Sequence, residues 1–314
     1  MRVTIGLPIW GDPPAQVGID AMVADCREAG MDGIFVGDHL AFSPADPSKY
    51  PYSDSGQFFL APEDAWYECF VTLGYVAAYA GSMELGLGVC LPVLRPPLLV
   101  AKQVATLAHL AKGDVTLGVG AGWMQAEFEA VGVPWKQRGR RLEDSVAVIR
   151  QYWTGAPSAG RYGDYVIPED MVSYPIPSKP LPVLVGGSSA IAVDRAARIG
   201  DGWFGALGQW EDGDALLAPT IAKFRAAWTR HRPGVPDPPV AVVQPVPSAV
   251  TRDEDFARLM TARLTAYCQM GVAKVVLNLS WRRPERVPAV LEVIRAAADR
   301  ALDAALPQST PTGG

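Results

Sequence analysis

Short apolar runs alternate with longer segments of helical periodicity along almost the whole chain. Each run is long enough for a buried parallel strand and too short for a helix. The expected strands cover residues 3–8, 33–36, 85–90, 115–119, 183–185, 202–206, 240–243 and 274–279. The expected helices cover residues 17–29, 64–79, 97–112, 140–153, 190–199, 216–231, 253–270 and 284–305. The pattern therefore predicts a regular succession of strand–helix pairs.

Such a succession predicts an α/β fold, a single (β/α)8 TIM barrel with insertion segments at its carboxyl-terminal face. A doubly wound open sheet is the alternative. Against it, no G-x-G-x-x-G motif lies between the first strand and the first helix. We expect one barrel domain over residues 1–306 and a disordered tail over residues 307–314.

The segment 41–62 follows neither period and is polar and aromatic. A loop of about twenty residues in a compact domain is usually a lid or a binding loop. Several aromatic residues are concentrated in and around this segment and could wall an apolar pocket, although some of them could be ordinary core. They are Trp10, Phe42, Tyr50, Tyr52, Phe58, Phe59 and Trp66.

The composition excludes several classes of function. The formal net charge is −5, so no basic surface for nucleic acid or an anionic membrane is indicated. No apolar run approaches the roughly 20 residues that span a bilayer, and the first residues lack the features of a signal peptide, so we expect a cytoplasmic protein. The four cysteines form no C-x-x-C pair and the three histidines are scattered, so we expect no disulfide framework and no metal site.

In a TIM barrel the active site lies at the carboxyl ends of the strands. This rule selects residues after several strands, among them four short groups: Asp38 and His39; Gly88, Val89 and Cys90; Gly120, Ala121, Gly122 and Trp123; and Gly186, Gly187 and Ser188. The glycines after the fourth strand remove the Cβ atoms that would keep a flat ligand off the backbone, and Trp123 offers an aromatic face beside them. A tight turn with an ordinary core tryptophan is the alternative.

His39 is the only histidine in this set. It could donate or accept a proton near neutral pH, with Asp38 orienting it or stabilising its charge. The alternative is a loop anchor bonded to backbone. Gly186, Gly187 and Ser188 precede a helix, where free N–H groups and a hydroxyl would suit a phosphate; a plain turn with a serine cap is the alternative there. For Arg138, Arg140 and Arg141 we favour a solvated helix start that pairs with Glu143 or Asp144 over contact with an anionic ligand tail.

Several motifs together resemble the bacterial luciferase-like superfamily, and most closely its coenzyme F420-dependent oxidoreductases. They are Gly37-Asp38-His39, LGLGVCLPVLRPPLLVAKQVATLAHLAKG, GVGAGW with the later RGRRLED, and PVLVGGSSAIAVDRAARIGDGW. They occur in the order typical of the family and span most of the chain.

The resemblance implies that F420 or FMN binds at the carboxyl ends of the strands. It implies a non-prolyl cis peptide between Gly88 and Val89 against the ring, and a phosphate near Gly186, Gly187 and Ser188 with backbone contributions from Ala121 and Gly122. It further implies that Asp38 contacts the cofactor and that His39 moves a proton. In the family's sugar-phosphate dehydrogenases a glutamate acid matches Trp123, so the aromatic residue here argues for a more apolar substrate.

The resulting prediction is hydride transfer between F420 and a small, fairly apolar organic substrate, with a homodimer as an open expectation. One alternative is an FMN-dependent monooxygenase that uses oxygen. Another is a barrel that binds flavin without catalysis.

Overall fold

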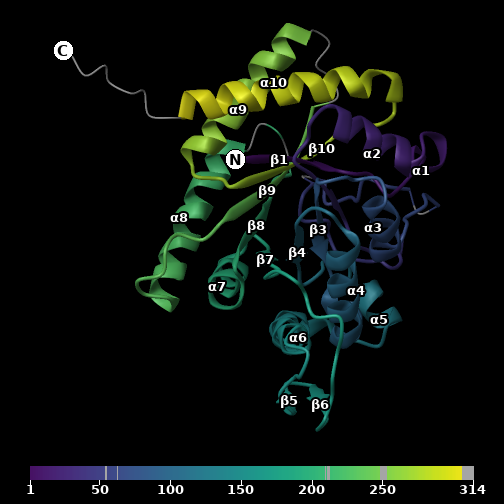
Figure 1. Cartoon of the computed structure of the whole chain (residues 1–314), viewed down its shortest axis with the longest axis vertical. Helices are drawn as coiled ribbons and strands as arrows, with labels where there is room; N and C mark the ends of the chain where they lie inside the picture. Colours follow the sequence, from purple (N-terminus) through teal and green to yellow (C-terminus); the bar gives the residue numbers. More distant parts are fainter. Residues whose placement is uncertain (54, 62, 209, 211–212, 248–252, 306–314) are drawn as a thin grey trace.

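Eight parallel strands close into a barrel in the part of the chain that the structure describes (Figure 1). The strand order β1-β10-β9-β8-β7-β4-β3-β2 returns to its start, which confirms the predicted TIM barrel and excludes the open sheet. The structure is a computed structural model, and it describes residues 1–53, 55–61, 63–208, 210, 213–247 and 253–305. The expected tail at residues 307–314 lies outside these ranges.

Each barrel strand overlaps one of the apolar runs. The strands are β1 (Arg2–Gly6), β2 (Gly33–Val36), β3 (Glu84–Cys90), β4 (Val115–Val119), β7 (Val183–Gly186), β8 (Gly202–Ala206), β9 (Val240–Pro245) and β10 (Lys274–Asn278). Their residues are buried almost throughout because the strands are covered by helices outside and by side chains inside the barrel. The register between β3 and β4 shifts between Leu87 and Cys90, at the end of the barrel where the ligand was expected.

The predicted helices all surround the barrel (Figure 1). They are α2 (Ile19–Glu28), α3 (Cys69–Ala77), α4 (Pro97–Leu110), α6 (Arg138–Tyr152), α7 (Ala190–Ile199), α8 (Gly213–His231), α9 (Asp253–Gln269) and α10 (Val287–Ala305). Among the described helices, none combines the length and the apolar character that a membrane-crossing segment needs.

Helix α3 begins later than predicted, at Cys69 and not at Asp64. The Glu68 carboxylate accepts a hydrogen bond from Val71 N and caps the helix there. The preceding residues are extended, because Trp66 forms an isolated bridge with Trp10. Residues 64–68 thus belong to the loop that precedes α3 and not to the helix.

Several short elements were not predicted from the sequence, because they have too few residues to show a periodic pattern of apolar positions. They are α1 (Pro13–Gln16), α5 (Gln125–Ala130) and the hairpin of β5 (Gly160–Tyr162) and β6 (Tyr165–Ile167). The hairpin packs beyond α6, at the edge of the molecule (Figure 1). Helix α5 follows β4 directly and contributes to the site.

The inside of the barrel is filled by a small cluster of apolar side chains. Phe35, Leu184, Phe204, Ala241 and Val276 form it, and each is at most 3% exposed. The barrel is therefore a packed core and not a pore, and any ligand must bind at one of its two ends.

Candidate active site

A cavity of about 1240 Å³ opens at the carboxyl ends of the strands. Its size is sufficient for a cofactor together with a small substrate, because drug-sized ligands occupy about 300–1,000 Å³. Most of the predicted site residues line it, namely Asp38, His39, Gly88, Val89, Ala121, Gly122, Trp123, Gly186 and Gly187. Cys90 and Ser188 are not among its lining residues.

One side of the cavity is bare backbone at Gly88, Val89, Gly120 and Gly122, which we call the glycine wall. The peptide bond between Gly88 and Val89 is cis, as expected, and both residues line the cavity with Gly120. A Cβ on Gly120 would lie 2.7 Å from Val89 Cγ2, and Gly122 has a φ of +77°, which side chains rarely adopt. These positions therefore require glycine, and they leave a surface against which a flat ring can lie.

His39 is enclosed by aromatic rings. Its ring centroid lies 4.9 Å from that of Phe42, 5.2 Å from that of Trp66 and 5.8 Å from those of Phe58 and Trp123. The imidazole is held at both nitrogens, since Trp123 Nε1 donates to Nε2 at 3.3 Å and Nδ1 lies 3.0 Å from Glu127 Oε2. The His39 ring is thus fixed in an aromatic environment, with 9% of its side chain exposed.

Asp38 takes a different part from the one expected. Both residues line the cavity, but the Asp38 carboxylate and the imidazole have different hydrogen-bond partners. Its carboxylate binds both guanidinium nitrogens of Arg95, at 2.5 and 2.7 Å, and accepts from Leu91 N at 2.8 Å. Glu127, and not Asp38, is the carboxylate that binds the His39 ring.

The sequence reasoning missed Glu127. It lies on α5, a helix too short to detect by periodicity, and it is 2% exposed. No local pattern in the sequence singles it out, because its partner His39 lies 88 residues away along the chain. It also missed Arg95, which ends the short turn after β3.

Cys90 does not reach the cavity. Its side chain is fully buried, and burial first, then the Asp38 carboxylate, raise the pKa of its thiol. Its backbone carbonyl accepts a hydrogen bond from Gly120 N at 2.9 Å. Its placement therefore makes it a support for the glycine wall and offers no side chain to a ligand.

The predicted phosphate turn precedes α7. Gly186, Gly187 and Ser189 line the cavity, whereas Ser188 is exposed beside it. Gly187 has a φ of +117°, and Ser189 caps the helix through a bond from Ala192 N to its hydroxyl at 3.2 Å. The remaining N–H groups at this helix start are suited to an anion.

Four positively charged side chains line the same cavity, and we call them the cationic rim. Lys136, Arg138, Arg140 and Arg195 line the cavity, and among the described lining residues Asp38 is the only carboxylate. Burial, and then the neighbouring Arg195, lower the pKa of Arg138, so these two cations crowd each other. The expected helix-start pairing holds for Arg140, which lies 3.9 Å from Asp144, whereas Glu143 binds Arg195 and Arg198. The residues present therefore fit a planar, anionic cofactor.

The segment 41–62 covers the cavity, apart from residues 54 and 62, which are outside the described residues. Tyr50 and Tyr52 line the cavity, and burial raises the pKa of both phenols. A Cβ on Gly208 would lie 2.9 Å from Tyr52 O, so the loop packs tightly against the far wall. All the aromatic residues expected in the wall line the cavity except Phe42, which stacks on Phe58 at 5.0 Å.

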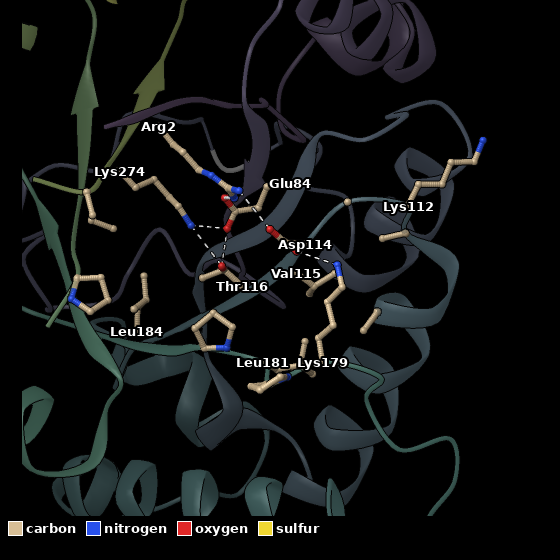
Figure 2. A pocket seen from close by; sticks show the side chains of 18 of the residues that line it. Arg2, Glu84, Lys112, Asp114, Val115, Thr116, Lys179, Leu181, Leu184 and Lys274 are labelled. Carbon is tan, nitrogen blue, oxygen red and sulfur yellow. Dashed lines mark hydrogen bonds and ion pairs between the residues drawn. The ribbon is translucent and has the colours of Figure 1, made fainter. Parts of the chain in front are cut away.

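A second cavity, of about 970 Å³, lies at the amino ends of the strands (Figure 2). Figure 2 shows Arg2, Lys274 and Thr116 directed at the Glu84 carboxylate, with Asp114 between Arg2 and Lys179. Burial lowers the pKa of the Lys274 ammonium, and Glu84 opposes that shift. The polar groups here bind one another, which marks this end of the barrel as structural.

The fold and the site define a TIM barrel with a large cavity at the carboxyl ends of its strands, and comparison with known proteins gives its family. Residues 20–308 match the luciferase-like monooxygenase family, so the chain belongs to this family. The resemblance read from the motifs is thereby confirmed.

Two relatives illustrate what the family contains. An F420-dependent glucose-6-phosphate dehydrogenase of Beutenbergia cavernae is 35% identical over 205 residues, which are 64% of this chain and 56% of that protein. An uncharacterised protein of Mycobacterium tuberculosis H37Rv is 34% identical over 190 residues, 60% of this chain and 65% of the relative. The matched regions thus span less than two thirds of each relative.

Solved structures share the fold at low sequence identity. An F420-dependent secondary alcohol dehydrogenase in complex with an F420–acetone adduct aligns with a TM-score of 0.74 and 15% identity, over 95% of this chain and 98% of that one. The EDTA monooxygenase of Chelativorans sp. BNC1 aligns with a TM-score of 0.67 and 14% identity, over 96% of this chain and 94% of that one. The architecture therefore serves both F420-dependent and monooxygenase enzymes.

Proposed function

We propose that this protein is an F420-dependent oxidoreductase that transfers a hydride between F420 and a small, fairly apolar organic substrate. The observation that carries the proposal is the juxtaposition of a fixed imidazole, His39, with a bare glycine wall and a cationic rim in one cavity. The deazaflavin, when bound, would supply the hydride chemistry, and the protein supplies binding, orientation and proton transfer.

The chain's residues divide into three roles. Gly88, Val89, Gly120, Ala121 and Gly122 would hold the ring against backbone. The helix start at Gly186 and Gly187, with Ser188 and Ser189 beside it, would bind the phosphate. Arg138 and Arg195 would neutralise the rest of the anionic tail.

His39 would take or return the proton of the substrate oxygen. Its Nε2 accepts a hydrogen bond from Trp123 Nε1, and a substrate hydroxyl or carbonyl that replaces this bond would meet one acceptor, Nε2, and one donor, the indole N–H. An alcohol–carbonyl couple requires this combination, because the oxygen loses a proton in one direction and gains it in the other. Asp38 would support the strand end beneath His39 through Arg95.

The substrate part of the cavity favours apolar molecules. Tyr50, Phe58, Phe59, Trp66 and Trp10 wall it, and the Asp38 carboxylate is neutralised by Arg95. A sugar phosphate would need more hydrogen-bonding groups than these rings offer, and Trp123 stands where the resemblance places the acid of the sugar-phosphate dehydrogenases. Simple alcohols, ketones or enones are the expected class. A homodimer stays a prediction, which sedimentation of the purified protein tests.

The test is a redox assay of F420 and reduced F420 with a panel of small alcohols, ketones and enones. We expect turnover by the wild type and a loss of about 10²-fold or more in His39→Ala, since a positioned acid–base group contributes 10²–10⁴-fold. The matched control is His109→Ala, because His109 binds Ile176 O at 2.8 Å and lines the cavity at the amino ends of the strands, not this one. Oxygen consumption with reduced FMN, without any F420 turnover, would replace the proposal with a monooxygenase.

A further inference from the structure

The two hydrogen bonds of the His39 ring determine which nitrogen carries its proton. An indole N–H can only donate, and Trp123 Nε1 points at His39 Nε2 at 3.3 Å. Nε2 must therefore accept, so the neutral ring carries its proton on Nδ1. Nδ1 lies 3.0 Å from Glu127 Oε2, and its N–H donates to that oxygen.

Donors reach both oxygens of the Glu127 carboxylate. Leu40 N donates to Oε1 at 2.5 Å, and Ala41 N lies 3.5 Å from the same oxygen. Two accepting oxygens are what an ionised carboxylate provides. The side chain is 1% exposed, and among the described residues His39 is its only ion-pair partner. A buried carboxylate of this kind costs free energy, so its retention here calls for a role.

The helix that carries Glu127 is itself fixed by the loop over the cavity. Asp46 accepts a hydrogen bond from Ala126 N through its carboxylate, and Ser48 Oγ accepts from Gln125 N at 3.2 Å. Glu127 therefore binds the first residues of the loop, while the middle of the same loop binds the helix of Glu127. The position of the carboxylate and the packing of the loop depend on each other.

We propose that Glu127 is the positioning residue of His39. Its carboxylate holds the ring proton on Nδ1 and so presents Nε2 as the base to the substrate oxygen, and it ties this orientation to the packed loop. The catalytic part of this inference rests on the proposed function, but the state of the ring does not, because it concerns the protein alone.

The first test is nitrogen NMR of the histidine side chains in the cofactor-free protein. The three rings are assigned with a His39→Gln variant. We expect the neutral His39 ring to show a protonated Nδ1 and an unprotonated Nε2. A ring protonated on Nε2 would overturn the proposal, and this result needs no substitution of Glu127.

The second test compares Glu127→Gln with Glu129→Gln. Glu129 lies on the same helix but is exposed and accepts a hydrogen bond from the Gln125 side chain at 2.8 Å, so it is a matched control. In Glu127→Gln the side-chain amide has one acceptor oxygen, whereas two sets of donors bind the native carboxylate. One set is the N–H groups of Leu40 and Ala41, and the other is His39 Nδ1. If that oxygen keeps Leu40 N, the NH₂ group faces Nδ1 and drives the proton to Nε2, which then opposes the Trp123 donor.

We expect Glu127→Gln to shift His39 toward the Nε2-protonated form and to lower kcat by about 10²-fold, with KM and cofactor affinity within about threefold of wild type. Glu129→Gln should change none of these. An unaltered His39 ring or an unaltered kcat in folded Glu127→Gln would refute the positioning role. If the wild type turned over no substrate while the NMR result held, the proposed function would fail and the ring assignment would stand.

Discussion

Arg95 grips both carboxylate oxygens of Asp38 in a buried pair, with nitrogen–oxygen distances of 2.5 and 2.7 Å. The two residues are 9% and 4% exposed, so water screens the pair very little. The pair joins the segment after β2, which carries His39, to the turn after β3, the strand that carries Gly88 and Val89 of the glycine wall. Its geometry therefore affects the positions of both His39 and the glycine wall.

Asp38→Asn should destabilise the protein by about 3–5 kcal/mol, because it leaves the buried Arg95 charge with the longer pair to Glu68, at 3.4 Å, in place of the bidentate one. Urea unfolding followed by circular dichroism measures this change. The control is Asp164→Asn, since Asp164 is 62% exposed in its pair with Arg141 and should contribute less than about 1 kcal/mol. Equal effects of the two substitutions would show that the buried pair does not stabilise the strand ends.

Trp123→Phe should lower kcat by about 10²-fold while the protein stays folded. The substitution keeps an aromatic ring but removes the N–H that would stabilise charge on the substrate oxygen, and such donors contribute about 10²–10³-fold. Steady-state kinetics with an alcohol or ketone substrate measures the loss. Trp153→Phe is the control, because Trp153 Nε1 binds Ala101 O outside the cavity. A kcat within twofold of wild type would exclude Trp123 from the reaction.

Arg138→Ala should weaken binding of F420 about tenfold, and the loss should shrink as salt is added. Arg138 lines the cavity beside Arg195, and an anionic ligand tail would relieve the repulsion between them. Fluorescence titration measures the dissociation constant. Arg141→Ala should leave it unchanged, since Arg141 binds Val93 O and stacks on Tyr165. Equal affinities of the two variants would place the anionic tail elsewhere.

Lys274→Met should cost about 3 kcal/mol of stability and leave cofactor affinity unchanged. Lys274 binds the buried Glu84 carboxylate at the amino end of the barrel, so its loss leaves that charge with the half-exposed Arg2 and the Thr116 hydroxyl (Figure 2). Thermal unfolding and an F420 titration on the same sample separate the two effects. A selective loss of affinity would show that the second cavity takes part in binding.

Much of the fold could be predicted from the sequence, because each barrel strand is short, apolar and bounded by turns. Strand β4 and helix α7 match their predicted bounds, and β2 does as well. The misplaced start of α3 shows where periodicity fails. The residues before Glu68 have helix-compatible side chains, but a tertiary bridge between Trp10 and Trp66 holds them extended.

The candidate site, like the fold, could be predicted in part from the sequence. Glycines at strand ends have a meaning that sequence reveals, and most of those predicted line the cavity. Partnerships across long separations leave no local pattern. The bond between His39 and Glu127 joins positions 88 residues apart, and the pair of Asp38 and Arg95 joins positions 57 apart. The sequence therefore suggests His39 as the partner of Asp38, whereas the partner in the structure is Arg95, in the turn after β3.

The most direct test of the whole account is a titration of the purified protein with F420 and, separately, with FMN. We expect F420 to bind with a micromolar or lower dissociation constant and FMN to bind at least tenfold more weakly, because the cationic rim extends beyond a single phosphate. Tight binding of FMN with no detectable binding of F420 would contradict the central claim.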